Sequence, residues 1–435
     1  MDITSNQIQD SAASAIPIQV LVRTTKERLE ADFSKLRTQI HRFPRGLRQK
    51  GVDERYIIPS FVSLGPYHHN KEHLLETEEL KHAAAYYLCE NYGHSVQEVY
   101  GKILSIVGEA RSCYPDDVVA KFTDAQFAVM MFLDGCYLLL YMGGTGESVL
   151  LSNRMTLSTG PCMLRDIFLL ENQLPWVVLE TLTAFMIPSY LYDFVISMAK
   201  AFDITPSSYP DSNTRVYELV KYRPPHLLGL LQYYLIGSMP REALAGNSFS
   251  LASSAIELEE IGIKLTASEN TWFADMSIQR DPIFGGQLSL TPLFINDYTA
   301  SWLVNMAAYE ACMATGFPLD GFFISSYISL LAMLMDKEED VHELRAKHLV
   351  RGFFSNHELL VFFKGLARHL RLGNRYFVIT EKIEMYKRDK PMSIAGYRFA
   401  YNNIRVIRVM AALLSMASVL AGLFRTLMSL KQHQP

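Results

Sequence analysis

The sequence contains few cysteines and lacks a paired-cysteine motif. Only 5 cysteines occur in 435 residues, and no two of them form a C-x-x-C pair. A small and odd-numbered set of cysteines does not form a disulfide framework in a chain of this length. The first 20 residues do not resemble a secretory leader, because Pro17 and Gln19 interrupt the short apolar run before Val20 and no basic segment precedes it. No Asn begins an N-x-S/T glycosylation acceptor. These absences favour a cytosolic body with reduced, mostly buried thiols.

An excess of basic residues is absent as well. The chain has 41 Lys and Arg against 45 Asp and Glu, which gives a net charge of -4. Binding through phosphate contacts normally requires a basic surface, so nucleic acid is excluded as a general partner. Apolar residues make up 49% of the chain and charged residues 20%, which excludes a disordered or fibrous protein. We find no strong catalytic motif, and the sequence therefore specifies neither a reaction nor a cofactor.

The hydrophobic pattern predicts a mainly α fold. Three segments are too apolar for surface helices yet too short to cross a bilayer, and we predict them as central helices: Phe127–Met142, Ile167–Pro188 and Phe322–Met335. Amphipathic or charged helices are predicted at Thr25–Gln39 and Leu74–Asn91. The large helical body is thus built around buried apolar helices.

A few short strands are expected in the second half of the chain. Residues alternate in character, or are bounded by Gly and Pro, at Gly262–Leu265, Met276–Ile278 and Gln287–Leu290. This pattern indicates a few short strands or one small antiparallel sheet. The chain is accordingly divided into three parts, which are a disordered N-terminal tail over residues 1–30, a single α-rich domain over 31–400 and a C-terminal transmembrane helix over 405–430.

The C-terminal segment is the longest apolar stretch. From Val409 to Leu430 the only charged residue is Arg425, which lies near one end and can extend to the headgroups. Such a helix can span a hydrocarbon core of about 30 Å. Basic residues precede it, so the positive-inside rule predicts a single-pass anchor with a cytoplasmic body. The alternative is a buried last helix of the bundle. The membrane interpretation is favoured, with these lipid-facing residues: Val409, Leu413, Leu420 and Phe424.

Four sequence strings together resemble one protein family. They are Val62–His69 (VSLGPYHH), Met131–Tyr137 (MFLDGCY), Arg165–Pro175 (RDIFLLENQLP) and Asn305–Glu310, within an apolar segment. In order and spacing they resemble the plant-specific domain of unknown function 247 family, also described as UPF0481-like, from about Ile40 onward. The resemblance implies an α-rich body with a C-terminal membrane anchor and no established reaction. Some grass members are linked to pollen–stigma self-incompatibility as candidate male determinants.

The residues of these signature strings are interpreted as structural. We expect them to lie against the helical core, largely buried and hydrogen-bonded, rather than in an open cleft. The set comprises Gly65, Pro66, Tyr67, His68, Asp134, Gly135, Arg165, Asp166, Glu171, Asn172, Gln173 and Pro175.

The densest group of candidate metal ligands surrounds the first string. It contains His68, His69, His73 and His82, and Glu78 shares a helix face with His82 because four residues separate them. A zinc site needs three or four converging ligands. However, the spacing matches neither H-E-x-x-H nor a Cys/His knuckle, so a Gly-Pro turn that bonds to the following helix start is the favoured interpretation.

Asp134 and Glu171 are carboxylates within apolar segments. An unpaired buried carboxylate costs several kcal/mol or becomes protonated. Two such groups with separated pKa values could work as an acid and a base. We favour a scaffold role, in which Asp134 accepts hydrogen bonds from backbone or a Tyr, Glu171 secures a helix end and Arg165 supplies a charge partner.

Two functions remain open from the sequence. The first is a plant membrane-anchored recognition or signalling component without catalytic turnover, bound to lipid through its last helix and to a protein partner. Its specificity would lie in the breaker-rich connections at 205–213, 240–254 and 143–153. The alternative is an uncharacterised hydrolase or metal-dependent enzyme that uses the His/Glu-rich segment. Convergence of those side chains and metal analysis would separate the two.

Overall fold

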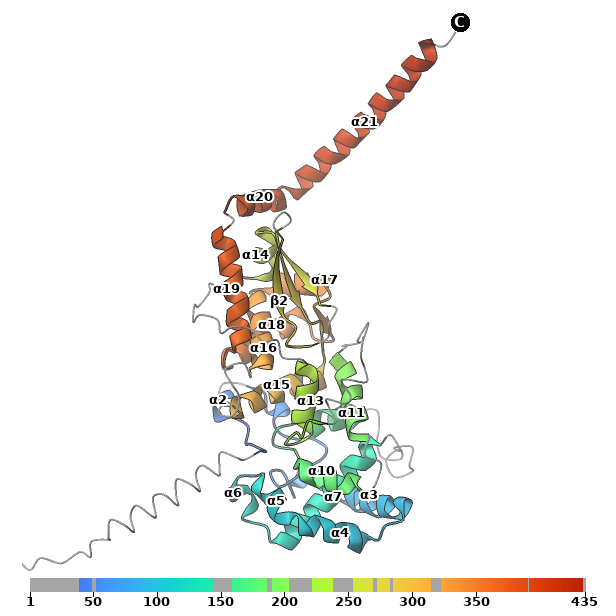
Figure 1. Ribbon diagram of the computed structural model, residues 1–435, viewed down its shortest axis with the longest axis vertical. Coiled ribbons are helices and arrows are strands. Elements are labelled where there is room, and N and C mark those ends of the chain that lie inside the picture. The colour runs from blue at the N-terminus through green and yellow to red at the C-terminus, as the bar shows by residue number, and fades with distance from the viewer. Residues whose placement is uncertain are drawn as a thin grey trace, which may run out of the picture.

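The computed structural model shows an elongated helical body from which one long helix projects (Figure 1). It describes residues 39–48, 52–143, 159–185, 190–202, 221–237, 253–268, 272–281, 285–313, 322–389 and 391–432. The predicted tail over 1–30 and nearly all of the predicted helix at Thr25–Gln39 lie outside these residues. The prediction of a mainly helical fold with short strands and an apolar C-terminal helix is confirmed.

Helix α7 (Asp124–Met142) is the centre of the N-terminal half. It begins at a capping box formed by Thr123 and Gln126, and nearly all its residues from Phe127 onward are buried. Five helices pack around it, which are α3 (Glu76–Tyr92), α4 (Val96–Ser105), α5 (Val107–Ser112), α10 (Trp176–Thr183) and α11 (Tyr190–Ala199). A helix that is apolar on all sides needs such enclosure.

The predicted helix over Ile167–Pro188 is confirmed at α10 (Trp176–Thr183), but its first part is wrong. Helix α9 (Thr159–Ile167) ends where it should begin, and residues 168–175 form turns before α10 starts after Pro175. The amide of Gln173 donates to the carbonyls of Ile167 and Leu169, at 2.7 and 2.9 Å. Such side-chain bonds compete with helical hydrogen bonds, so an apolar run that looks continuous is broken here.

The predicted strands exist, but their sheet is mixed. Strands β1 (Ile263–Ala267), β2 (Ser277–Asp281) and β3 (Gly285–Leu290) have the order β1-β3-β2. The β2–β3 pair is antiparallel, whereas β1 and β3 are parallel. The expectation of a wholly antiparallel sheet is therefore wrong. Strand β3 lies in the centre of the sheet, between β1 and β2 at the two edges.

The C-terminal half packs around two buried helices, α15 (Asp297–Cys312) and α16 (Phe323–Leu334). The other described elements are α2 (Arg45–Arg48), η1 (Glu54–Tyr56), η2 (Glu72–Leu74), α6 (Asp116–Val119), η4 (Lys200–Phe202), α13 (Leu227–Ile236), α14 (Ala255–Glu260), β4 (Leu293–Ile295), α17 (Glu338–Ala346), β5 (Val350–Gly352), α18 (Asn356–Ala367), α19 (Asn374–Asp389), α20 (Pro391–Asn402) and α21 (Ile404–Gln432). Strands β4 and β5 form a second, parallel pair.

Within the part of the chain that the structure describes, two helices have the length and composition of a membrane span, and they differ in burial. The apolar window of α7 is 78% buried, whereas that of α21, Arg405–Leu423, is 0% buried. Helix α21 leaves the body beyond α20 and extends away from it (Figure 1). The first is a core helix, and the second presents its apolar surface outward.

Candidate functional site

Asp166 fixes the backbone of the segment that leads into the first signature string. Its Oδ2 accepts hydrogen bonds from the N–H groups of Ser60, Phe61 and Val62, at 2.9, 2.6 and 3.2 Å. Burial raises the pKa of Asp166 to about 6, against the opposing effects of Arg165 and these three donors. Arg165 pairs with Asp166 at 3.3 Å and also donates to Ser60. Arg165, which the sequence analysis expected to pair with Glu171, therefore pairs with Asp166 instead.

Asn172 and Gln173 connect the first string to the core. Asn172 Oδ1 accepts from Leu64 N at 2.7 Å, and its Nδ2 donates to Val62 O at 3.0 Å. Gln173 Oε1 accepts from Leu228 N at 2.9 Å, at the start of α13. Both amides are buried and satisfied, so they join segments that are distant in the chain.

Lys81 and Asp134 form a buried ion pair beneath the Gly-Pro turn. Nζ lies 2.7 Å from Oδ1 of Asp134 and 2.6 Å from Oε1 of Glu78. The other Asp134 oxygen accepts from Gly65 N at 2.8 Å. Burial would lower the pKa of Lys81, but the two carboxylates raise it above its ordinary value, so the lysine is charged. The structure therefore supplies Asp134 with a lysine partner that the sequence analysis did not assign.

Glu171 secures a different part of the chain. Its Oε1 accepts from Phe43 N at 2.8 Å, and its Oε2 lies 3.7 Å from His68 Nε2 and 3.9 Å from Arg48 Nη1. Within the described residues, Glu171 and Asp134 share no hydrogen-bond or ion-pair partner, and no hydrogen bond joins the two carboxylates. The arrangement does not resemble an acid–base pair.

The remaining signature residues lie close by. Tyr67 donates through its hydroxyl to Ile40 O at 2.9 Å, and Pro66 is buried beside it. Gly65 has a φ of 74°, and a Cβ there would lie 2.7 Å from the Tyr114 hydroxyl. Gly135 faces Leu182, whose Cδ1 would be 2.3 Å from an added Cβ. Close packing thus explains both glycines.

The four histidines make separate contacts. His68 Nδ1 lies 2.7 Å from Lys71 Nζ, and His73 Nε2 bonds to a backbone carbonyl at 3.1 Å. The ring of His69 packs edge-on against Phe122, and His82 is exposed. Among the residues that the structure describes, no group of three or more His, Cys, Asp or Glu is arranged to hold a metal. Burial lowers the pKa of His68 to about 3, so this ring is neutral.

Glu310 is a buried carboxylate to which the sequence analysis gave no role. It accepts from Ile324 N, Ser325 N and the Ser325 hydroxyl at 2.7–2.9 Å, and from Gln232 Nε2 at 3.2 Å. Burial raises its pKa to about 7, against these donors. The group caps α16 at the helix N-terminus, where a negative charge is favourable. The sequence contained a signal for this role, because Glu310 is a carboxylate within the apolar 305–310 string.

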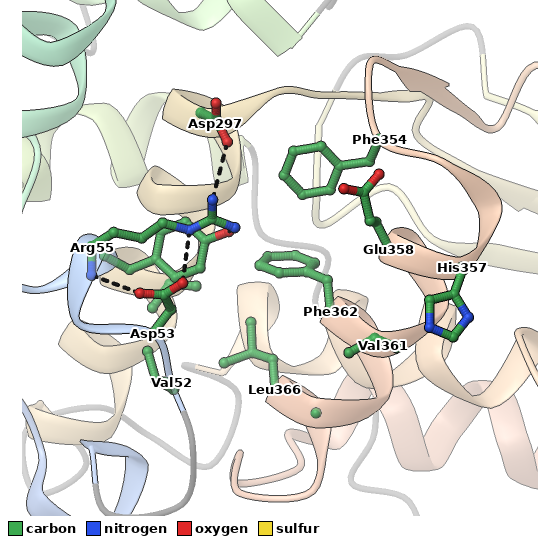
Figure 2. A pocket seen from close by; sticks show the side chains of 13 residues that line it. Val52, Asp53, Arg55, Asp297, Phe354, His357, Glu358, Val361, Phe362 and Leu366 are labelled. Atoms are coloured by element: carbon green, nitrogen blue, oxygen red, sulfur yellow. Dashed lines mark hydrogen bonds and ion pairs between the residues drawn. The ribbon is translucent and has the colours of Figure 1, made fainter.

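A pocket of about 430 Å³ lies between η1, α15 and α18 (Figure 2). Its apolar lining includes Tyr56 and Phe362, and Arg55 lies at its edge with Asp53 3.0 Å and Asp297 3.6 Å away. The polar lining groups have structural partners. Arg55 forms the two ion pairs just given, His357 contacts Glu338, and Glu358 forms hydrogen bonds with Ser355 at the start of α18.

The cysteines are free thiols, and three of the five are buried. Burial raises the pKa of Cys113 to about 11 and that of Cys312 to about 12, and raises that of Cys136 well above its ordinary value. Thiols that stay protonated at neutral pH are poor nucleophiles.

The predicted anchor residues lie on the projecting helix. The exposed fractions are 59% for Val409, 52% for Leu413 and 65% for Leu420. The side chain of Phe424 lies outside those that the structure describes. An exposed apolar helix of this length is compatible with a single membrane span.

Fold and site together define an α-rich protein with buried polar networks and an exposed apolar C-terminal helix. The chain belongs to the DUF247 family, described as plant protein of unknown function, whose family model matches residues 40–418. It is similar to the UPF0481 protein At3g47200 of Arabidopsis thaliana, with 25% identity over 350 residues that cover 71% of this chain and 68% of that protein. No solved structure matches it. The family resemblance is confirmed.

Proposed function

We propose that this chain is a single-pass membrane protein whose cytoplasmic body binds a protein partner without catalytic turnover. The observation that carries the proposal is the exposure of α21, whose apolar window has no cover from the body. Large apolar side chains in water cost free energy in proportion to their area. A bilayer removes that cost, and the basic residues before Val409 favour a cytoplasmic body.

The use of the polar groups supports a non-catalytic role. The signature carboxylates and amides hold backbone segments together, as Asp166 and Asn172 do for residues 60–64. A catalytic group must instead face a substrate and have a pKa matched to its task. The rigid scaffold would present loops to the partner. The loops suggested for specificity, at 205–213, 240–254 and 143–153, lie almost wholly outside the described residues and stay predictions, as does a role in self-incompatibility.

The alternative is a hydrolase or a metal-dependent enzyme that uses the His/Glu-rich segment. The separate contacts of His68, His73 and His82 give this alternative little support. Metal analysis of the purified full-length chain tests it. A stoichiometric metal that is lost on His73→Ala and His82→Ala substitution would favour the enzyme.

Deletion of residues 405–435 tests the membrane proposal. The full chain should stay with membranes during alkaline carbonate extraction, whereas the truncated chain should be released with unchanged thermal unfolding of its body. A Leu413→Arg/Leu420→Arg variant should be released in part, and Leu413→Val/Leu420→Val is its matched apolar control. Identical soluble fractionation of all four chains would refute membrane anchoring.

A further inference from the structure

Among the side chains of α20 that the structure describes, Tyr397 contacts the body. The ring of Tyr397 lies over Gly262, where an added Cβ would be 2.5 Å from the ring, and this glycine has a φ of 87°. In the preceding helix α19, the hydroxyl of Tyr386 donates to Ile261 O at 3.2 Å. Two tyrosines thus fix α19 and α20 to the turn that precedes β1.

The opposite side of α20 faces away from the body. Phe399 follows Tyr397 by two residues, which is a rotation of about 200° around an α-helix. Its side chain is 67% exposed, and Arg398 beside it is exposed too. A large exposed aromatic next to an arginine is typical of a helix at a membrane–water interface.

Three hydrogen bonds connect the end of α20 to the start of α21. Asn403 N and Nδ2 both donate to Phe399 O, at 3.1 and 2.8 Å, and Ile407 N donates to Asn403 O at 2.9 Å. Figure 1 shows that the helix direction changes at this point. The junction therefore connects a helix lying on the body to one that projects from it.

The charge that α20 and α21 themselves carry has one sign, whereas Glu259, Glu260 and Glu343 of the body lie near Tyr401 at the end of α20. Arg405 and Arg408 are exposed on the first turns of α21, three residues apart and hence on one face. Within the described residues, neither they nor Arg398 form an ion pair. No acidic residue occurs after Asp389 in the whole sequence. These arginines are placed between the body and the apolar part of α21, at the level that lipid headgroups would occupy.

We propose that the outer face of α20 and the first turns of α21 form a lipid-binding surface for anionic phospholipids of the leaflet next to the body. This inference rests on the proposed membrane anchoring by α21. Guanidinium groups bind phosphate oxygens with paired hydrogen bonds, and Phe399 enters the region between headgroups and acyl chains. The anionic surface is complementary to a cationic junction that continues directly into the anchor. The lipid contact would hold the body at a fixed orientation to the membrane.

The test uses full-length protein in nanodiscs of phosphatidylcholine with phosphatidylserine. A Phe399→Trp variant reports the environment of this position by its fluorescence, after subtraction of the parent signal. Brominated phosphatidylserine should quench the new tryptophan several-fold more than brominated phosphatidylcholine at equal content. Each basic residue near an anionic surface contributes a factor of about five, so the triple change Arg398→Gln, Arg405→Gln, Arg408→Gln should remove the preference.

A matched control carries the same number of lost charges on the body, as Lys102→Gln, Lys121→Gln and Arg368→Gln, and should keep the preference. A chain that does not enter nanodiscs would refute the proposed anchoring itself. If the Phe399→Trp chain enters them but neither lipid quenches the introduced fluorophore, the lipid-binding surface alone would be overturned. Equal quenching by the two lipids, or a preference that survives the triple change, would overturn the anionic specificity.

Discussion

Lys81 and Asp134 form an ion pair that is shielded from water, with Nζ and Oδ1 2.7 Å apart and the Lys81 side chain 0% exposed. One carboxylate oxygen pairs with the lysine and the other accepts from Gly65 N. Removing one partner of a buried pair leaves the other charge uncompensated, which costs more than the pair itself contributes. This pair joins α3, α7 and the Gly-Pro turn.

The substitution Lys81→Met should therefore lower the free energy of unfolding by about 3–5 kcal/mol. Asp134→Asn should be similarly harmful, and the double variant should recover part of the loss because neither Lys81 nor Asp134 is then left buried without the other. Urea unfolding followed by circular dichroism measures all three. A loss below about 1 kcal/mol for Lys81→Met would show that the pair has no structural role.

Glu171→Ala should lower stability by about 1–3 kcal/mol, because Phe43 N loses its buried acceptor. Glu171→Gln retains an acceptor of the same length and is the matched control, with a smaller expected loss. The measurement is the melting temperature of the full chain. An unchanged melting temperature together with a changed binding or enzymatic activity would instead place Glu171 in a functional site.

Gly65→Ala should destabilise the protein more than Gly93→Ala. Both glycines have a positive φ, 74° and 71°, but only Gly65 is enclosed, with Gln173 O 2.9 Å from an added Cβ. The left-handed conformation alone costs an L-residue about 1–2 kcal/mol, and the Gly65 variant adds a clash with backbone. Chemical unfolding of both variants isolates the packing contribution. Equal losses would show that the turn can relax.

His226 should make stability fall in mild acid. Burial lowers its pKa to about 3, whereas an unfolded histidine titrates near 6.5, so below that pH the unfolded chain binds the additional proton. The contribution is fully present above pH 6.5 and is lost as pH falls towards 3. Between pH 6.5 and 5 the expected loss is about 2 kcal/mol.

Buried carboxyls with raised pKa values, Asp134 among them, act in the opposite direction, so the pH effect is measured as a difference. Asp166 and Glu310 have pKa values raised to about 6 and about 7 by burial, and their contribution is lost as pH rises through these values. His226→Asn keeps an acceptor for the α13 cap but cannot be protonated, so its stability should decrease less between pH 6.5 and 5. Parallel pH profiles for the two chains would contradict the assignment.

Apolar runs in the sequence predicted two core helices, but they did not predict the hydrogen bonds that side chains form in the folded protein. Predicted Phe127–Met142 and Phe322–Met335 match α7 and α16 within three residues, because a long apolar run has few alternatives. The break after Ile167 was missed, since it depends on amide bonds that Gln173 makes in the fold.

The signature strings contain several buried polar residues, but the sequence did not predict the partners of these residues. Lys81 could have been recognised, because it lies on the buried face of α3 with Thr77, Ala84 and Leu88. Its pairing with Asp134 depends on how α3 packs against α7, and this packing cannot be predicted from a single sequence. The contact between Glu310 and the start of α16 likewise depends on how α15 packs against α16.

The central claim is that α21 crosses a bilayer with the body on the cytoplasmic side. Since no Asn in the chain begins a glycosylation acceptor, an N-x-T acceptor on a short linker after Pro435 reports the location of that end alone. When the full chain is synthesised with microsomes, we predict glycosylation of this acceptor and protease digestion of the body from outside. An unmodified acceptor on a chain that carbonate releases from the microsomes would contradict the account.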